Sequence, residues 1–347
     1  MILDSETLLL SPSVELLIRE SNGLGLPGRL KTELFASVVE LNTEICRDVK
    51  EAHQALTALR RAADGIARAN ELRIAAAGSH PISPPEVEPI ADDPRYLEFV
   101  EYAGISARRQ GVSGIHVHVG MPSATACFHA LENVLPWLPL VLALSANSPY
   151  LAGGESGHLS VRAQVLAELP RAGAPPPFAS YDDWERFIDR YVALGLVDGY
   201  TRFWWDIRPH PSFGTLEIRI PDQPTALELT VALAALLQAL CSVALEQPQR
   251  RQPAARGDYA QNRWAALHSG PNAELIHPDG DRLVRAPELA EELLELVRPA
   301  AEELATLHLV KRLDPSRCEA ERQLEVGRAR GLEAVSADLV HRTVGSG

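Results

Sequence analysis

The stretch SGIHVHVG, residues 113–120, alternates polar and apolar side chains and is the part of the sequence that decides the fold. Successive side chains of a β-strand point to opposite faces of a sheet. His116 and His118 therefore share one face, while Ile115 and Val117 share the other. By itself this pair is weak evidence for a metal site, because an antiparallel sheet with one solvated face shows the same alternation.

Two further stretches repeat the pattern. In GTLEIRIPD, residues 214–222, Glu217 and Arg219 share one face opposite branched apolar residues. In SVVELN, residues 37–42, Glu40 lies on the polar face. A merely solvated face would mix Lys, Thr, Ser and Glu. These strands instead offer carboxylates, imidazoles and a guanidinium, which suit a hard divalent cation and a phosphate.

The sequence makes separate predictions for two carboxylates of this polar surface, Glu33 and Glu217. Glu33 lies seven residues before Glu40 and reaches the same surface if the chain between them bends. Glu217 is expected on a wet strand face, where it would contribute little to the core. Its replacement should therefore leave the melting temperature almost unchanged.

Helical periodicity surrounds these strands. The apolar spacing predicts helices over residues 48–70, 124–145, 181–194, 225–245, 287–303 and 320–341. Further strands are expected at residues 72–77 and 202–208. Residues 151–178 are rich in Gly and Pro, and we expect them to form a lid or binding loop, because loops of this length in compact domains are often functional. No GxxxxGK[ST] motif occurs, and the few strands among many helices show no βαβ rhythm, which argues against a Rossmann fold.

Composition bounds the function classes. The chain has 347 residues, 46% of them hydrophobic, and a formal net charge of −13. This charge argues against binding to nucleic acid or to an anionic membrane. The four cysteines form no CxxC pair, and no secretory signal is recognisable. We therefore expect one domain over residues 1–347, soluble and cytoplasmic.

A few polar residues outside the three strands have plain structural interpretations. Asp206 and Arg208 share a strand face and could form a structural ion pair. Arg162, within the Gly- and Pro-rich stretch, could be an ordinary surface residue. Asn262 and Arg263 are expected at a junction between a loop and a helix, where a capping role is the simplest interpretation.

Six stretches, taken in order, resemble the carboxylate–amine ligases of the glutamate–cysteine ligase type 2 group, the YbdK-like proteins. They are LPGRLKTELFASVVELNTEICRD (26–48), AAAGSHP (75–81), GIHVHVGMPS (114–123), LALSANSPYLAGGESGHLSVRAQV (142–165), WWDIRPHPSFGTLEIRIPD (204–222) and NRWAALHSG (262–270). They run in the family's order over nearly the whole chain.

The resemblance implies an α+β, glutamine-synthetase-like catalytic domain, with a curved antiparallel sheet flanked by helices. It also implies ATP and Mg²⁺ on the concave face and an ADP-forming ligase reaction that joins a carboxylate and an amine through an acyl phosphate. The default substrates are glutamate and cysteine, giving γ-glutamylcysteine. A homodimer or higher homo-oligomer is the implied assembly.

The resemblance also implies roles for individual residues. The positions that match metal ligands of the superfamily are Glu33, Glu40, His116 and Glu217. Arg219 falls where a cation meets the transferring phosphate, and Arg219 and Glu217 are the candidate catalytic residues. The residues expected to line the nucleotide or substrate pocket are His118, Arg208 and Arg162.

One feature departs from the family pattern. Family members open with a strand of pattern GxEEE just before a segment like MILDSETLLL. Met1 stands where that strand would already have ended. We therefore expect acidic ligands to be missing from the site, and a vacant sheet edge beside the strand that holds Glu40.

Two other function classes stay open on the sequence alone. The first is a catalytically weakened ligand-binding or regulatory homologue of the same fold. The second is a metal-dependent hydrolase built on His116 and His118, which would need a bound nucleophilic water and further ligands that the sequence does not offer.

Overall fold

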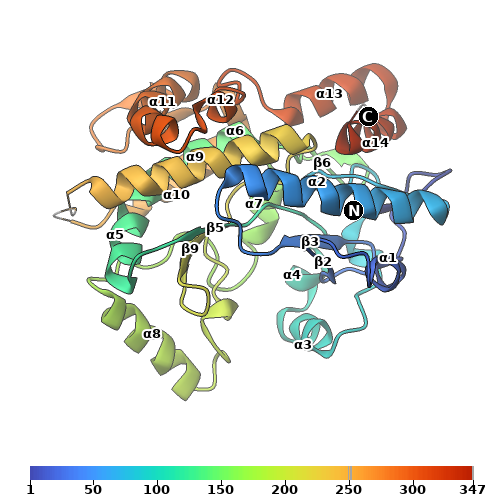
Figure 1. Ribbon diagram of the computed structural model, residues 1–347, viewed down its shortest axis with the longest axis horizontal. Coiled ribbons are helices and arrows are strands. Elements are labelled where there is room, and N and C mark those ends of the chain that lie inside the picture. The colour runs from blue at the N-terminus through green and yellow to red at the C-terminus, as the bar shows by residue number, and fades with distance from the viewer. Residues whose placement is uncertain (249, 251, 346–347) are drawn as a thin grey trace.

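The computed structural model describes residues 1–248, 250 and 252–345, and Figure 1 shows its arrangement. Its helices and strands are β1 (Ile2–Asp4), α1 (Val14–Ser21), β2 (Gly28–Thr32), β3 (Val39–Thr43), α2 (Val49–Ala69), β4 (Leu72–Ile74), α3 (Pro94–Ala103), α4 (Ile105–Arg108), β5 (Val117–Gly120), α5 (Ala124–Val134), α6 (Leu138–Ser145), β6 (Tyr150–Leu151), β7 (Gly154–Glu155), α7 (Val161–Leu166), α8 (Tyr181–Ala193), β8 (Ile207–His210), β9 (Thr215–Ile218), α9 (Leu227–Glu246), α10 (Arg256–Ser269), β10 (Glu274–Ile276), β11 (Leu283–Arg285), α11 (Ala286–Glu303), α12 (Leu307–Val310), α13 (Glu319–Arg330) and α14 (Leu332–Val344).

The three-stranded antiparallel sheet β5–β9–β8 lies beneath the long helix α9 (Figure 1). The alternation predicted from the sequence sets its two faces. Ile115, Ile218 and Ile207 lie on the apolar face and belong to the largest buried cluster, which also contains residues of α5, α6 and α9. The polar side chains of the same strands therefore lie on the opposite face, away from this helical layer.

The hairpin β2–β3 forms a second antiparallel ladder, in which Lys31 pairs with Glu40 and Leu30 with Leu41. Leu30, Val39 and Leu41 face a separate core cluster beneath α1 and α2. Within the described residues, β3 pairs only with β2. The expected antiparallel strand pairing and the flanking helices are thus confirmed. Among the described residues, the strands form one three-stranded sheet and four two-stranded ladders.

Two apolar helical segments form the centre of the molecule. Residues Ala124–Ser145 and Leu227–Glu246 are long and apolar enough to cross a membrane by composition, but 72% and 61% of their most apolar windows are buried inside the protein. In Figure 1, α9 lies beside α2 on one side and beneath α11 and α12 on the other. These segments are therefore core helices of the fold.

Three expectations about local structure need correction. Residues 151–178 are not one long loop, because they contain β6, β7 and α7. The single helix expected at 320–341 is two helices, α13 and α14, separated at Gly331, whose φ of +85° lies in the left-handed region that glycine adopts readily. The strand expected at 202–208 is shorter, because residues 200–202 form a 3₁₀ turn before β8.

Candidate functional site

Strand register brings three polar side chains into one row across the sheet. His118 of β5 pairs with Glu217 of β9, and Glu217 pairs with Arg208 of β8. Arg219 follows at the end of β9, and its Nη1 donates to Nδ1 of His116 at 3.3 Å. The two strand stretches and the WWDIRP segment thus place their polar residues together, as the sequence predicts.

Glu217 is a buried member of this row and does not lie on a wet face. Its side chain is only 2% exposed, whereas those of His116 and His118 are 36% and 31% exposed. Arg208 donates to both carboxylate oxygens, with Nε to Oε2 at 2.6 Å and Nη2 to Oε1 at 3.4 Å. Arg219 donates to Oε1. The expectation that Glu217 lies on a wet strand face is therefore wrong, because two guanidinium groups make it part of a buried ion network.

The two arginines keep Glu217 ionised. Burial alone would raise the pKa of this carboxyl, but the positive charges of Arg219 and Arg208 outweigh that effect and hold its pKa well below its ordinary value of 4.5. The carboxylate balances one guanidinium, so one positive charge is left over. Arg219, 17% exposed, is the more accessible of the two arginines.

The imidazoles on this face are neutral at physiological pH. Desolvation by the surrounding protein, followed by the Arg219 cation, lowers the pKa of His116 well below its usual range. Desolvation also lowers the pKa values of His118 and His210, although the negative charge of Glu217 opposes it. This part of the strand face therefore combines a net positive charge with neutral imidazoles, in a chain whose overall charge is −13.

Arg162 is a buried positioning residue and not a surface residue, so the plain interpretation made from the sequence is wrong. Its side chain is 3% exposed. Its Nη1 donates to the carbonyl of Ile220 and its Nη2 to the carbonyl of Arg219, both at 2.8 Å. It fixes the end of β9 from which Arg219 projects. Its expected place in the nucleotide pocket stays a prediction.

Asp222 is the residue that the sequence analysis missed. It is completely buried and accepts hydrogen bonds from the backbone N–H of Asn147 at 2.9 Å and from the hydroxyls of Ser148 and Ser160 at 2.6 and 2.8 Å. Arg162 lies 3.8 Å away. The only signal in the sequence is that this carboxylate directly follows residues 217–221. An Asp after a strand is equally common in an ordinary turn, so the signal does not mark a buried residue.

Asp206 does not pair with Arg208, in contrast to the ion pair considered from the sequence. Its Oδ2 accepts from the hydroxyl of Tyr259 and from Nε of Arg263, both at 2.8 Å. Asn262 and Arg263 lie in the middle of α10, so their expected capping role is also wrong. Asn262 instead bonds to the backbone of Ile276 in β10.

The two hairpin carboxylates lie near each other at the end of β2 and on β3. Oε1 of Glu33 accepts from the backbone N–H of Leu34 at 2.8 Å. Burial raises the pKa of Glu33, and the negative charge of Glu40 raises it further, while Arg219 opposes the shift. The hairpin and the end of β9 are thus close enough to interact electrostatically.

A preformed metal centre is not visible in the arrangement of these donors. Among the described residues, no three His, Cys, Asp or Glu side chains converge on one point. Both oxygens of Glu217 are occupied by arginine donors. Glu33 and Glu40 are the donor pair whose chemistry fits Mg²⁺, which is typically held by one or two carboxylates together with waters and substrate phosphates. The four metal-ligand assignments stay predictions.

An aromatic cluster lies beside His118, at the end of the strand face away from Arg219. The rings of His210 and Phe213 are stacked, with centroids 4.2 Å apart and an interplanar angle of 11°. Phe213 is 67% exposed. His118 contacts both rings edge-on at 5.2 and 5.6 Å, and its Nδ1 lies 3.0 Å from the hydroxyl of Thr215. The strand face therefore changes from cationic at Arg219 to aromatic at the β8–β9 turn.

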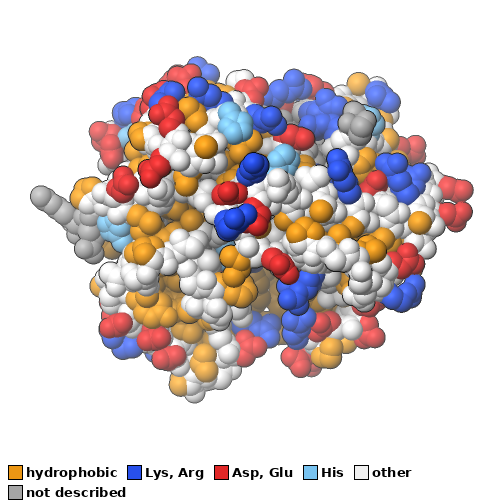
Figure 2. Space-filling model, viewed as in Figure 1, with side chains coloured by type: hydrophobic (Ala, Val, Ile, Leu, Met, Phe, Trp, Pro, Cys, Tyr) orange, Lys and Arg blue, Asp and Glu red, His pale blue; other side chains and the backbone are white. Residues whose placement is uncertain are grey.

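Figure 2 shows a hollow in the lower half of the molecule, between the part that contains α8 and the part that contains α3. Helix α3, on one side of this hollow, makes its contacts through three side chains at helical spacing. Tyr96 donates to the carbonyl of Thr32 at 3.0 Å, Phe99 packs on Trp204 at 5.2 Å, and the hydroxyl of Tyr102 accepts from Arg171 at 3.3 Å. No residue of α3 is fully buried.

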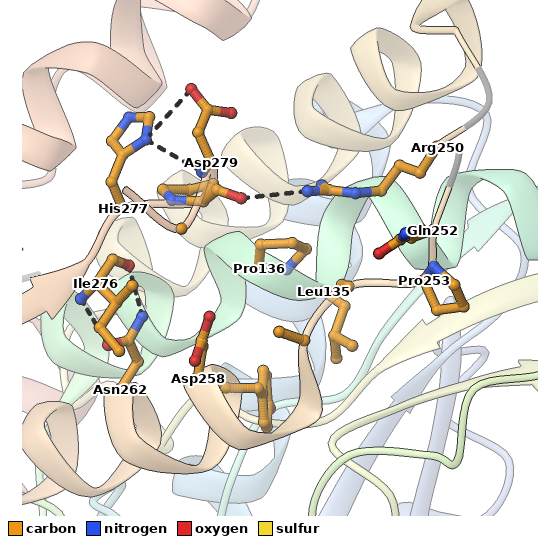
Figure 3. Close-up of a pocket in the computed structure, with 15 residues that line it drawn as sticks. Leu135, Pro136, Arg250, Gln252, Pro253, Asp258, Asn262, Ile276, His277 and Asp279 are labelled. Carbon is orange, nitrogen blue, oxygen red and sulfur yellow. Dashed lines mark hydrogen bonds and ion pairs between the residues drawn. The ribbon is translucent and has the colours of Figure 1, made fainter. Parts of the chain in front are cut away.

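Two pockets lie elsewhere among the described residues. The first, of about 250 Å³, is drawn in Figure 3 between α10 and the β10–β11 hairpin, where Arg250 donates to the carbonyl of Pro278. The second, of about 410 Å³, lies between α10 and residues 164–174. Neither is lined by any of the site residues predicted from the sequence, so the strand face remains the candidate active site.

Sequence comparison places the chain among known proteins. Residues 5–336 match the sequence model of glutamate–cysteine ligase family 2. A protein of Rubrobacter xylanophilus with the provisional name glutamate–cysteine ligase 2-3 is 38% identical over 346 residues, covering 99% of this chain and 94% of its own length. A Sorangium cellulosum relative with the provisional name glutamate–cysteine ligase 2 is also 38% identical, over 99% and 93% of the two chains.

Structural comparison supports the same fold. The chain is similar to the glutamate–cysteine ligase of Francisella tularensis, solved with AMP, at a TM-score of 0.70 and 16% identity over 99% of this chain and 86% of that one. It is also similar to the Pup ligase PafA, solved with ADP, at a TM-score of 0.52 and 15% identity over 98% and 70%. The fold is therefore the glutamine-synthetase-like fold that the resemblance implied. Because both the family's sequence model and relatives above 30% identity span nearly the whole chain, the protein belongs to glutamate–cysteine ligase family 2.

Proposed function

We propose that the protein is an ATP-dependent carboxylate–amine ligase of the glutamate–cysteine ligase type. The observation that carries the proposal is the strand face on which Arg208 and Arg219 both donate to the buried Glu217, beside neutral imidazoles. Such a surface holds a fixed positive charge where a phosphoryl group would move. Family membership and the nucleotide complexes of the two structural neighbours support the same reaction class.

In the proposed reaction, an oxygen of the substrate carboxylate attacks the γ-phosphorus of ATP, and the bond from that phosphorus to the bridging oxygen breaks to give ADP. The Arg219 guanidinium stabilises the negative charge spread over the transferring group. Glu217 and the carbonyl contacts of Arg162 hold Arg219 in place before the substrate arrives, so little reorganisation is needed. The amine nitrogen then attacks the acyl carbon, inorganic phosphate leaves, and one proton is released to solvent.

The test of this function is ADP release from MgATP, measured over a panel of acids combined with amines. Glutamate with cysteine is the default pair. Amide formation should accompany ADP release in a one-to-one ratio. If ATP binds but no pair on the panel raises ADP release above background, the alternative of a weakened ligand-binding or regulatory homologue is favoured.

Glu33 and Glu40 would hold Mg²⁺ together with the phosphates, and the ion would supply charge neutralisation there. Replacing Glu40 by Gln should weaken the Mg²⁺ dependence of ATP binding. We expect the Mg²⁺ concentration for half-maximal binding, measured calorimetrically at fixed ATP, to rise about tenfold. Glu44→Gln, in the exposed chain just after β3, is the control. Equal behaviour of the two variants would remove Glu40 from the metal site.

The aromatic end of the strand face is the proposed support for the adenine base. Stacking on an exposed aromatic ring is worth about 1–3 kcal/mol per base. Phe213→Ala should therefore raise the KM for ATP about tenfold and leave kcat nearly unchanged, whereas Phe213→Trp should restore it. Steady-state kinetics with ATP as the varied substrate checks this, and an unchanged KM in the Ala variant would place the base elsewhere.

The region of residues 151–178 remains the proposed lid, since an acyl phosphate must be shielded from water. Arg171, in this segment, contacts Tyr102 of α3 and the rings of Phe203 and Trp204. We propose that these contacts hold the lid against the rest of the protein when it is closed. Amide exchange of residues 167–178 should slow when ATP and the acid are bound; unchanged exchange would contradict the lid.

We further propose that the protein is cytoplasmic and forms a homo-oligomer. Light scattering at several protein concentrations would test the oligomeric state.

A further inference from the structure

Two histidines outside the strand face point their ring nitrogens at each other. His158 lies in the segment between β7 and α7, and His268 lies in the last turn of α10. Nδ1 of His158 is 3.4 Å from Nδ1 of His268. The side chain of His268 is exposed and that of His158 is half-buried, so the pair is open to solvent on one side.

This separation is long for a hydrogen bond and also matches the spacing of two ligands of one metal ion. An N–H···O or N–H···N bond normally has its heavy atoms about 2.7–3.2 Å apart, and the observed distance is longer. Two imidazole nitrogens bound to one tetrahedral Zn²⁺, each at about 2.0–2.1 Å, lie roughly 3.3–3.4 Å from each other. The observed spacing of 3.4 Å therefore leaves room for one metal ion between the two nitrogens.

The pair is held in place by the backbone on both sides. The N–H groups of Leu159 and Ser160 both donate to the carbonyl of Leu267, at 2.9 and 3.0 Å. Residues adjacent to each histidine are thus bonded to each other, which fixes the distance between the two side chains. A site whose ligands are already positioned loses less conformational entropy on binding an ion.

Trp264 supports the two rings from one side. It lies one helical turn before His268, and its ring is parallel to that imidazole, at 2° and a centroid separation of 6.4 Å. The ring of His158 meets Trp264 edge-on at 5.4 Å. In the part of the chain that the structure describes, neither histidine forms an ion pair with a carboxylate, so no acidic partner competes for the imidazoles.

We propose that His158 and His268 form a bidentate surface site for a borderline divalent transition metal, of the class of Zn²⁺, Cu²⁺ and Ni²⁺, with water in the remaining positions. Imidazole selects these ions over Mg²⁺ and Ca²⁺, which prefer oxygen ligands. The site is separate from the strand face and does not depend on the ligase reaction.

The proposal is tested by titrating the full chain with Zn²⁺ in the presence of excess Mg²⁺ and without nucleotide, by calorimetry. The wild type should bind one Zn²⁺ per chain at this site. His158→Gln and His268→Gln should each weaken that binding at least about tenfold. His341→Gln, an exposed helical histidine elsewhere, is the matched control and should bind as the wild type does.

A second readout locates the ion. Ni²⁺ should quench part of the tryptophan fluorescence of the wild type, and Trp264→Phe should remove that part while keeping the Ni²⁺ affinity. Thermal melting confirms that each variant is folded. If both histidine variants bind Zn²⁺ as tightly as the wild type, or if the quenching survives in Trp264→Phe, the pair is only a contact between two side chains and the proposal is wrong.

Discussion

Glu217→Gln is expected to lower the rate of ADP formation by about a hundredfold to a thousandfold, the range seen when one electrostatic group is removed from a preorganised site. The amide cannot balance Arg208 and Arg219, which both donate to this carboxylate. The Arg219 guanidinium, which we propose meets the phosphoryl group, would then be free to turn away. ADP release at saturating MgATP, acid and amine measures the effect.

The same substitution should also destabilise the protein. Breaking a buried ion pair by removing one partner typically costs about 3–5 kcal/mol, and Glu217 is only 2% exposed. Urea unfolding at pH 7 measures this cost. The control is Glu155→Gln, which breaks an exposed carboxylate–Arg328 pair and should change stability by at most about 1 kcal/mol. A variant that retains full activity would show that Glu217 is only a structural partner.

The pH dependence of this stability difference has a definite sign. The pKa of Glu217 is lower in the folded protein than its ordinary value of 4.5. Its ionised form therefore stabilises the fold fully above about pH 4.5, and the contribution is lost as the pH falls from there toward the depressed folded pKa. The difference between wild type and Glu217→Gln should be constant from pH 6 to 8 and should shrink below pH 4.5.

Asp222→Ala is expected to have the largest effect on folding. The substitution leaves the buried hydroxyls of Ser148 and Ser160 without their acceptor, and it removes the carboxylate that lies 3.8 Å from the buried Arg162 guanidinium. We expect a loss of about 3–5 kcal/mol, which is a large part of the roughly 5–15 kcal/mol that stabilises a typical domain. The midpoint of urea unfolding measures this loss.

A milder variant separates hydrogen bonding from charge. Asp222→Asn keeps one oxygen acceptor for the serine hydroxyls but removes the negative charge near Arg162, so its cost should lie between those of wild type and Asp222→Ala. Asp198→Ala, which breaks an exposed pair with Arg202, is the control and should have little effect. If Asp222→Ala unfolds at the same urea concentration as Asp198→Ala, Asp222 does not organise the loops around β9.

The strand face could be predicted from the sequence because its information is local. His116 and His118, like Glu217 and Arg219, are two residues apart, and a strand repeats its direction every two residues. This period alone put the polar groups on one face and Ile115, Ile218 and their neighbours on the other. The long helices α2, α8, α9 and α11 were predictable for the same reason, since their apolar side chains recur with the period of a helix.

Tertiary structure alone decided which polar residues are buried and what they contact. Glu217 is buried because Arg208, nine residues earlier, reaches across from the neighbouring strand. Arg162 reaches the carbonyls of Arg219 and Ile220 from more than fifty residues away. Asp222 accepts from a residue as far back as Asn147. A sequence pattern reports the spacing of side chains along one element, but the cost of burying a charge is offset only by partners that the folded chain brings from elsewhere.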